Sequence, residues 1–304
     1  LPMYQYPKAI LSIPQLVQKM QNYGMIISSV PDAENIISRI GYFRLRGYCF
    51  HFFDHTTQQY LPGTNFSDVY ELYKFDFELS HLLFDFITKI EVSLRARLVD
   101  SLLIHNDALI LNDPSYFDDK ERYWKNMSAI SSEIARSNDV FVKHNFDKHD
   151  GVIPVWAVAE ILSFGTLSKL IKTLKIGAGS SLSKLVNHYR YMSPNQKLVA
   201  PSKQMFTSWI QSVSILRNIC AHNGRVYNRT ITTMPELVLQ DVQNPRPKSG
   251  GLYQVVMAMK YLRPSDEDWN EFKVAVNAIF SKYISVVDLA RLNFPTDWAN
   301  HFQI

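Results

Sequence analysis

Apolar residues recur every three or four positions along most of this 304-residue chain, which is the spacing of one face of an α-helix. The longest such stretch is residues 67–103. Its apolar positions are Leu72, Phe75, Leu79, Leu82, Phe86, Ile90, Leu94 and Leu98. At about 1.5 Å per residue, a helix of this length exceeds 50 Å. We therefore expect a long helix that forms a spine for the others.

The same periodicity predicts shorter helices on both sides of this spine. They cover residues 11–24, 32–41, 118–137, 155–162, 166–174, 181–191, 202–222, 252–262 and 266–292. Ser12, Ser67 and Thr166 are suitable N-cap residues, and Gly24 and Gly41 are suitable helix ends.

Four segments do not fit the helical pattern. Residues 42–54 are aromatic and basic, with an alternation that predicts a strand or a turn. Residues 230–234 predict a short strand, and residues 143–154 and 239–251 predict loops. The whole pattern predicts an all-α fold with small irregular pieces.

Composition narrows the class of protein only slightly. The chain is 46% hydrophobic and 13% aromatic, enough for a large core, and its net charge of +4 permits an RNA partner without requiring one. The two cysteines, Cys49 and Cys220, are far apart, so we expect neither a disulfide framework nor a zinc site. His51, Asp54 and His55 lack a further metal ligand, so we expect no metal and no cofactor. No leader or membrane span is evident, which predicts a cytoplasmic protein.

The sequence SILRNICAHNGRVYNR, residues 214–229, contains the strongest candidate chemistry. It places Arg217, Asn218 and His222 at the end of an apolar helix, just before Asn223-Gly224. This pair is a helix stop in which Gly224 is free to adopt a positive φ. Apolar residues earlier on the helix form a core stripe, namely Phe206, Trp209, Val213, Leu216 and Cys220.

These residue types suit RNA cleavage by the 2′-hydroxyl of the substrate. Histidine can transfer the protons, arginine can stabilise the charged phosphorane, and Asn218 can orient either group. On a regular helix, however, five residues leave the side chains of Arg217 and His222 about 140° apart. Either the chain turns His222 back at the helix end, or two chains meet across a twofold axis. On spacing alone, a capping histidine and a surface arginine explain the pattern better, and Arg46 and His51 share the same spacing.

Four sequence blocks change this assessment. They are residues 39–52 (RIGYFRLRGYCFHF), 73–98 (YKFDFELSHLLFDFITKIEVSLRARL), 154–170 (PVWAVAEILSFGTLSKL) and 208–229 (SWIQSVSILRNICAHNGRVYNR). With these blocks in this order, the chain resembles the Abi-like family of bacterial phage-defence proteins (AbiD/AbiF type), within the HEPN superfamily. The C-terminal 75 or so residues contribute little to the resemblance.

The resemblance implies a fold, a site and partners. It implies an all-α, HEPN-like helical bundle core at residues 61–235, with helical additions at 1–60 and 236–304. It implies that Arg217, Asn218 and His222 form a metal-independent ribonuclease site, usually completed in a homodimer. It also implies a bacterial cytoplasmic protein of abortive infection, with RNA as substrate and a structured small non-coding RNA as a further partner.

Two further groups of residues have both a structural and a functional interpretation. Glu91 and Arg95 suit a helix-stabilising ion pair, and in this family they are expected beside the motif helix, where Glu91 could anchor Arg217 or Arg95. The aromatic and basic residues around Arg44 and Arg46 suit either single-stranded RNA or an aromatic core with extended arginines.

The residues after the motif, Arg225, Tyr227 and Arg229, suit either phosphate binding or a solvated loop. The first hypothesis for function is therefore an abortive-infection ribonuclease. The second is a non-catalytic protein that holds a structured small non-coding RNA, and the third is a helical scaffold for protein interactions.

Overall fold

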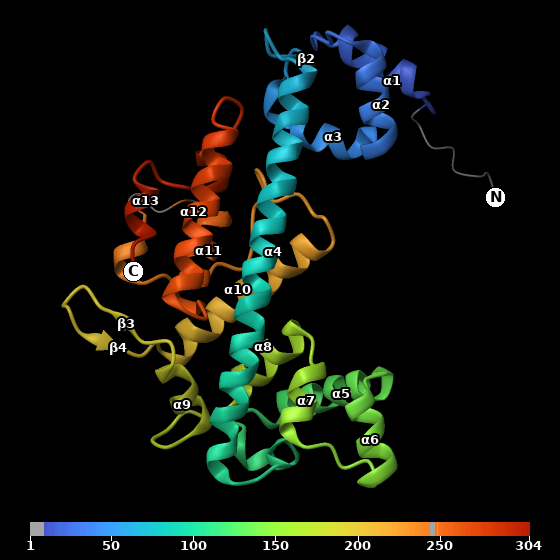
Figure 1. The fold of residues 1–304 in the computed structure, drawn as a ribbon. Coiled ribbons are helices and arrows are strands. Elements are labelled where there is room, and N and C mark those ends of the chain that lie inside the picture. The colour runs from blue at the N-terminus through green and yellow to red at the C-terminus, as the bar shows by residue number, and fades with distance from the viewer. Residues whose placement is uncertain (1–8, 244–246, 248) are drawn as a thin grey trace. The chain divides into compact units, whose positions relative to one another are not determined.

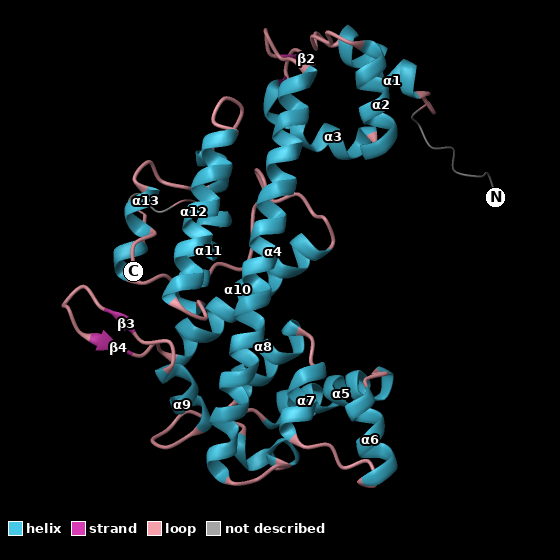
Figure 2. Cartoon of the chain, viewed as in Figure 1, coloured by secondary structure: helices cyan, strands magenta, loops and turns pink. Residues whose placement is uncertain are grey.

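The computed structural model describes residues 9–243, 247 and 249–304. Within these residues the chain forms thirteen α-helices and two antiparallel hairpins of very short strands (Figures 1 and 2). The prediction of an all-α fold is therefore confirmed. Part of the expected loop at 239–251, residues 244–246 and 248, lies outside the described residues. In the part of the chain that is described, no helix is both long and apolar enough to cross a bilayer.

The chain divides into two compact units. One contains residues up to 79 together with 277–288, and the other contains residues 80–276 and 289–304. The expected helical core at 61–235, with additions on either side, stays a prediction.

The first unit contains three short helices, a hairpin and the start of a long helix. Its elements are α1 (Ile13–Asn22), α2 (Val30–Ile40), α3 (Tyr42–Cys49), β1 (Phe53–Asp54), β2 (Gln59–Tyr60) and the first part of α4 (Phe66–Leu102). In the hairpin, Phe53 pairs with Tyr60. The N–H of Ser12 donates to Oε1 of Gln15 at 2.8 Å at the start of α1, and Gly24 and Gly41 both have φ of +89° after α1 and α2, as expected of helix ends.

The second unit contains α4 from Ser80 onward. It also contains the remaining helices and the second hairpin. They are α5 (Lys120–Arg136), α6 (Val140–Lys148), α7 (Val155–Ile161), α8 (Phe164–Thr173), α9 (Ser181–Asn187), β3 (Tyr191–Met192), β4 (Leu198–Val199), α10 (Lys203–Ala221), α11 (Leu252–Leu262), α12 (Asp266–Lys282, to residue 276) and α13 (Trp298–His301). Helix α10 packs against α8 and α11. Every residue of α11 is buried, so α10 lies beside a fully enclosed helix.

The long helix α4 is a single element of 37 residues, close to the predicted range. All but one of the predicted apolar positions are buried. The exception is Leu82, which is half-buried, whereas Leu83 beside it is fully buried. Because α4 starts at Phe66, Ser67 lies inside its first turn rather than at its N-cap.

Several other sequence predictions are wrong in detail. Residues 42–54 were expected to form a strand or a turn, but 42–49 form α3, with Leu45, Tyr48 and Cys49 buried at helical spacing, and only Phe53–Asp54 form a strand. Residues 230–234 form no strand. The expected loop at 143–154 contains two thirds of α6, and the expected helix at 266–292 ends at Lys282 and is followed by a separate 3₁₀ turn at 289–292.

The N-cap of α8 also differs from the prediction. Ser163, not Thr166, is the N-cap, and its hydroxyl accepts from the N–H of Thr166 at 3.3 Å. The side chain of Glu133 accepts from the N–H of Ser163 at 2.7 Å and from the hydroxyl of Thr166 at 2.7 Å. Burial acts to raise the pKa of Glu133, but these hydrogen bonds outweigh it and the pKa is lowered. An ionised Glu133 on α5 therefore holds the start of α8.

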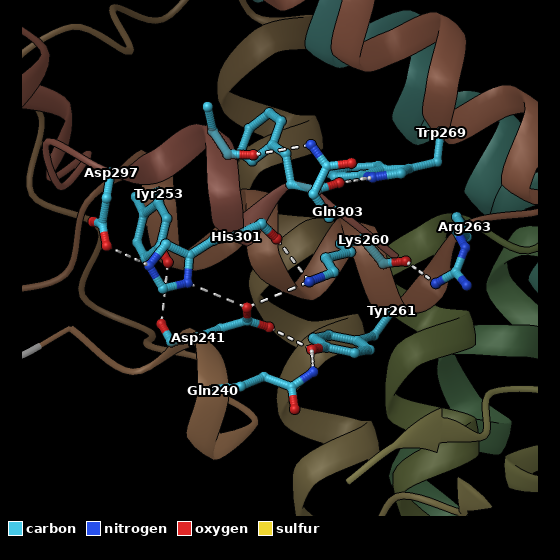
Figure 3. Close-up of polar contacts among 12 residues, drawn as sticks. Gln240, Asp241, Tyr253, Lys260, Tyr261, Arg263, Trp269, Asp297, His301 and Gln303 are labelled. Carbon is cyan, nitrogen blue, oxygen red and sulfur yellow. Dashed lines mark hydrogen bonds and ion pairs between the residues drawn. The ribbon is translucent and has the colours of Figure 1, made fainter. Parts of the chain in front are cut away.

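A buried ionic cluster fastens the C-terminal segment to α11 (Figure 3). Asp241 is almost fully buried, and its Oδ1 lies 3.3 Å from Nζ of Lys260 and 3.5 Å from Nδ1 of His301. Tyr261 donates its hydroxyl to the other oxygen of Asp241, and Lys260 also donates to the carbonyl of His301 at 2.7 Å. Burial lowers the pKa of Lys260, while the charge of Asp241 acts in the opposite direction. One carboxylate thus connects α11 and α13.

We predict that Asp241→Ala lowers the free energy of unfolding by about 3–5 kcal/mol, because Lys260 would keep a buried charge without its counter-ion. Urea denaturation followed by circular dichroism measures this loss. Asp266, which pairs with Arg263 at 2.7 Å but is exposed, provides the control, since Asp266→Ala should cost less than about 1 kcal/mol. Equal losses in the two variants would contradict the role given to Asp241.

Candidate functional site

Helix α10 carries the motif and is held along most of its length by buried contacts. Four of the five predicted core residues, Phe206, Trp209, Val213 and Leu216, have no exposed surface, and Cys220 is also buried. The indole N–H of Trp209 donates to the carbonyl of Glu236 at 2.7 Å. The core therefore sets the position and direction of α10. Only its C-terminal end, which is exposed, is available for a functional site.

That end closes in a Schellman motif. The N–H of Gly224 donates to the carbonyl of Ile219 at 2.7 Å, and the N–H of Asn223 donates to that of Cys220 at 3.0 Å. The left-handed residue is Asn223, with φ of 52°, so the prediction that Gly224 takes a positive φ is wrong. Glycine is needed at 224 for a different reason, because a Cβ there would lie 2.9 Å from the carbonyl oxygen of Ile219. His222, which lies between the last helical residue and Asn223, is the C-cap residue of α10.

Arg217 is held from three sides near the end of α10. Its Nε lies 3.6 Å from Oε2 of Glu91 on α4, and its guanidinium lies over the ring of Phe84 at 5.8 Å from the centroid. Its Nη1 donates to Oδ1 of Asn218 at 3.4 Å. The side chain is still 33% exposed, so the guanidinium is positioned but remains accessible.

Glu91 is shared between two arginines. Its Oε1 accepts from Nη2 of Arg95 at 2.8 Å, while its Oε2 faces Arg217. The same Nη2 of Arg95 donates to the carbonyl of Leu162, at the end of α7, at 3.0 Å. The structure therefore contains both contacts that were considered for Glu91, the one with Arg95 and the one with Arg217. The role of these contacts in a functional site stays a prediction.

His222 is exposed at the end of the helix. Its backbone N–H continues the helix by donating to the carbonyl of Asn218 at 3.1 Å. Among the described residues, its ring makes no hydrogen bond or ion pair, with Arg217 or with any other residue. Because α10 is regular to Ala221, the side chains of Arg217 and His222 leave the helix in different directions, about 140° apart. The turn after the helix does not bring them together within one chain.

The segment after the motif has a buried part and an accessible part. Val226 and Tyr227 are buried, with Tyr227 at 0% exposure, which does not favour the predicted contact of Tyr227 with RNA. Arg225 is half-buried and Arg229 is exposed. Nη1 of Arg229 donates to the carbonyl of Arg225 at 3.4 Å, which folds the two arginines onto one short loop beside the helix end.

The other predicted RNA-binding residues belong to the first unit. Arg44 and Arg46 both lie on α3 and both are exposed. Arg46 lines a cavity with Tyr42 and Phe43, whereas Arg44 is not part of that lining. The two arginines, which the sequence prediction placed in one RNA-binding group, therefore differ in their position relative to the cavity.

Sequence reasoning missed Phe84, which contacts the motif arginine. A usable signal was present, because Phe84 and Glu91 are seven residues apart and a helix returns to nearly the same face after seven residues. Both residues therefore face α10 from one side of α4. The sequence pattern does not show, however, that this face of α4 packs against Arg217.

Both cysteines are buried free thiols. Burial raises the pKa of Cys49 to about 11, with a hydrogen bond to Tyr60 and the charge of Arg46 acting in the opposite direction. Such a thiol stays protonated at neutral pH and is a poor nucleophile. In the part of the chain that the structure describes, no group of three or more His, Cys, Asp or Glu residues could hold a metal ion.

Comparison with known proteins gives one match. A family model described as Abi-like protein matches residues 35–228, more than half of the chain. The matched range includes α4, α10, Glu91 and the motif residues, and it ends within the loop that carries Arg225 and Arg229. No curated protein and no solved structure matched the chain.

We predict that Gly224→Ala lowers the free energy of unfolding by about 1–3 kcal/mol, because the new Cβ would be forced against the carbonyl of Ile219. Gly165, in the first turn of α8, is the matched control, since a Cβ there would meet no atom within 4 Å and its φ is not positive. Gly165→Ala should be neutral or stabilising by up to about 1 kcal/mol. Urea denaturation compares the two variants, and a Gly224→Ala variant as stable as Gly165→Ala would contradict the close approach at 224.

Proposed function

The chain belongs to the Abi-like protein family, and from this premise we propose that it acts in phage defence by abortive infection as a metal-independent endoribonuclease. The proposed site is the C-terminal end of α10. The observation that carries the proposal is that Arg217 is fixed by Glu91 and Phe84 yet partly accessible, at the same helix end as an exposed His222.

The charges around Arg217 favour an anionic ligand. Glu91 supplies one negative charge to two guanidinium groups, those of Arg95 and Arg217, so this group of three carries a net positive charge. Glu91 faces Nε of Arg217, and the terminal nitrogens retain donors for a phosphate. Arg225 and Arg229 add further positive charge on the adjoining loop, which suits the negative backbone of RNA.

The reaction we propose uses the 2′-hydroxyl of the RNA itself. Its oxygen attacks the adjacent phosphorus while its proton passes to the imidazole of His222. The P–O5′ bond then breaks, and the leaving oxygen takes a proton from an imidazolium. The products are a 2′,3′-cyclic phosphate and a 5′-hydroxyl. Arg217 stabilises the extra negative charge of the pentacovalent phosphorus.

We propose that two copies of the chain complete one site. A regular helix directs Arg217 and His222 of one chain apart, so a phosphate held by one chain's Arg217 would be served by the partner's histidine. A twofold axis near the ends of two α10 helices would form two such pairs, each with the arginine of one chain and the histidine of the other. In each pair the same imidazole would take the proton of the 2′-hydroxyl and then return a proton to the leaving oxygen. Asn218, which contacts Arg217, would position the guanidinium.

We predict that the purified chain cuts RNA in EDTA and that the cut strands end in 2′,3′-cyclic phosphate. His222→Ala should lower the cleavage rate by about 10²-fold or more, because proton transfer is lost. Arg217→Ala should lower it by a similar factor, because the phosphorane loses its counter-charge. Gel assays with end-labelled RNA measure the rates, and mass spectrometry identifies the ends.

Two variants serve as matched controls. His149 is also an exposed C-cap histidine, at the end of α6, and Arg190 is an exposed arginine of the same unit. His149→Ala and Arg190→Ala should cut at the wild-type rate. Cleavage by His222→Ala at that rate would refute the site. RNA binding without any cleavage would favour the alternative, a protein that holds a structured small non-coding RNA.

A further inference from the structure

The first unit contains a cavity of about 370 Å³ that is separate from the motif. It lies between α1, α3 and the β1–β2 hairpin, and all twelve residues that line it are between positions 19 and 60. Its volume is within the range of pockets that bind small molecules.

Aromatic rings form most of its wall. Tyr23 and Phe53 pack edge to face at 5.9 Å between centroids, and Phe53 and Tyr60 do so at 5.1 Å. Two further lining rings are left largely in solvent, because Phe43 is 88% exposed and Phe50 is 59% exposed. Exposed phenyl rings beside a ring-lined cavity provide faces on which a planar aromatic ligand can stack.

The charges in the cavity are positive. Lys19 and Arg46 both line it, and none of the lining residues carries a carboxylate. Nζ of Lys19 lies 5.8 Å from the centroid of the Tyr23 ring. Within the described part of the chain, neither Lys19 nor Arg46 forms an ion pair. Burial raises the pKa of Tyr42, while the charge of Arg46 acts against that rise, which places this charge close to the wall. The cavity therefore suits an anion.

The rim on the hairpin side is a turn with local hydrogen bonds. Asp54 accepts from the N–H of Thr56 at 2.8 Å and from the hydroxyl of Thr57 at 2.9 Å. Gln58 takes a left-handed φ of 57° and its side chain donates to the carbonyl of His55 at 2.7 Å. His55 and Gln58, which both line the cavity, thus belong to a hydrogen-bonded turn.

We propose that this cavity binds a single nucleotide, with its base against the aromatic rings and its phosphate against Lys19 and Arg46. A nucleotide has a planar aromatic ring, which can stack on the lining rings, and an adjacent negative charge, which can pair with the lining cations. Free nucleoside monophosphate and an unstacked nucleotide of an RNA strand share this chemistry. The proposal does not require the chain to cut RNA.

Fluorescence titration of the full chain tests the proposal with two probes. One is 2-aminopurine riboside 5′-monophosphate, and the other is a short 2′-O-methyl oligonucleotide containing one 2-aminopurine. The 2′-O-methyl groups remove the attacking hydroxyl, so binding is measured whether or not the chain is a nuclease. Stacking of the base should change the fluorescence in a saturable way.

Each substitution in the cavity has a matched control outside it. Arg46→Gln and Phe43→Ala change exposed lining residues and should weaken binding about tenfold or more. Arg39→Gln changes an exposed cation of α2 outside the lining, and Phe146→Ala changes a 51% exposed phenyl ring on α6. Both controls should bind as the wild type does.

The two probes distinguish the sources of the ligand. Saturable binding of the monophosphate that is lost in the cavity variants supports a site for free nucleotide. Binding of the oligonucleotide alone, lost in the same variants, supports a site for one nucleotide of an RNA strand. The proposal is overturned if neither probe saturates, or if the control variants lose as much affinity as the cavity variants.

Discussion

The carboxylate of Glu91 is the interaction on which the geometry of the motif depends. It is buried on α4, where an unpaired charge would be costly, and it is matched by Arg95 at 2.8 Å and by Arg217 at 3.6 Å. Arg95 also reaches the carbonyl at the end of α7. A single acid therefore connects α4, α7 and α10. It holds the guanidinium of Arg217, but its one negative charge does not neutralise both Arg95 and Arg217.

The regularity of α10 imposes the second constraint. Its core stripe packs beside α8 and α11, and its hydrogen bonds continue to His222 before the Schellman motif ends it. A helix held this firmly cannot turn Arg217 and His222 toward each other. The same rigidity that prevents a site within one chain would present both groups in fixed positions to a second copy. This is why we place the proposed chemistry between two chains.

Most of the helices could be predicted from the sequence because apolar spacing reports directly on a buried helical face. Helix α11 has the bounds that were predicted, and α4 differs by one residue at each end. The pattern failed in residues 42–49, where closely spaced aromatic residues fit both a strand and a helix. Strands of two residues, such as β1 and β2, are too short to give any periodic signal.

The site could be predicted only in part. The motif residues and the ion pair of Glu91 with Arg95 follow from spacing and family resemblance. The burial of Tyr227 depends on the path of the chain after the helix, and the contact of Phe84 with Arg217 depends on which faces of α4 and α10 meet. The cavity near Arg46 is built from three separate segments. Such features depend on tertiary packing, which local pattern does not encode.

The most direct measurement of the central claim is to mix the two inactive variants, Arg217→Ala and His222→Ala, under conditions in which subunits exchange. If the site is shared across a twofold axis, a mixed dimer retains one arginine and one histidine on different chains. The mixture should then regain roughly a quarter of the wild-type cleavage rate, since about half of randomly formed dimers are mixed and each keeps one of two pairs. Confirmed mixed dimers that remain as inactive as either variant alone would contradict a site built from two chains.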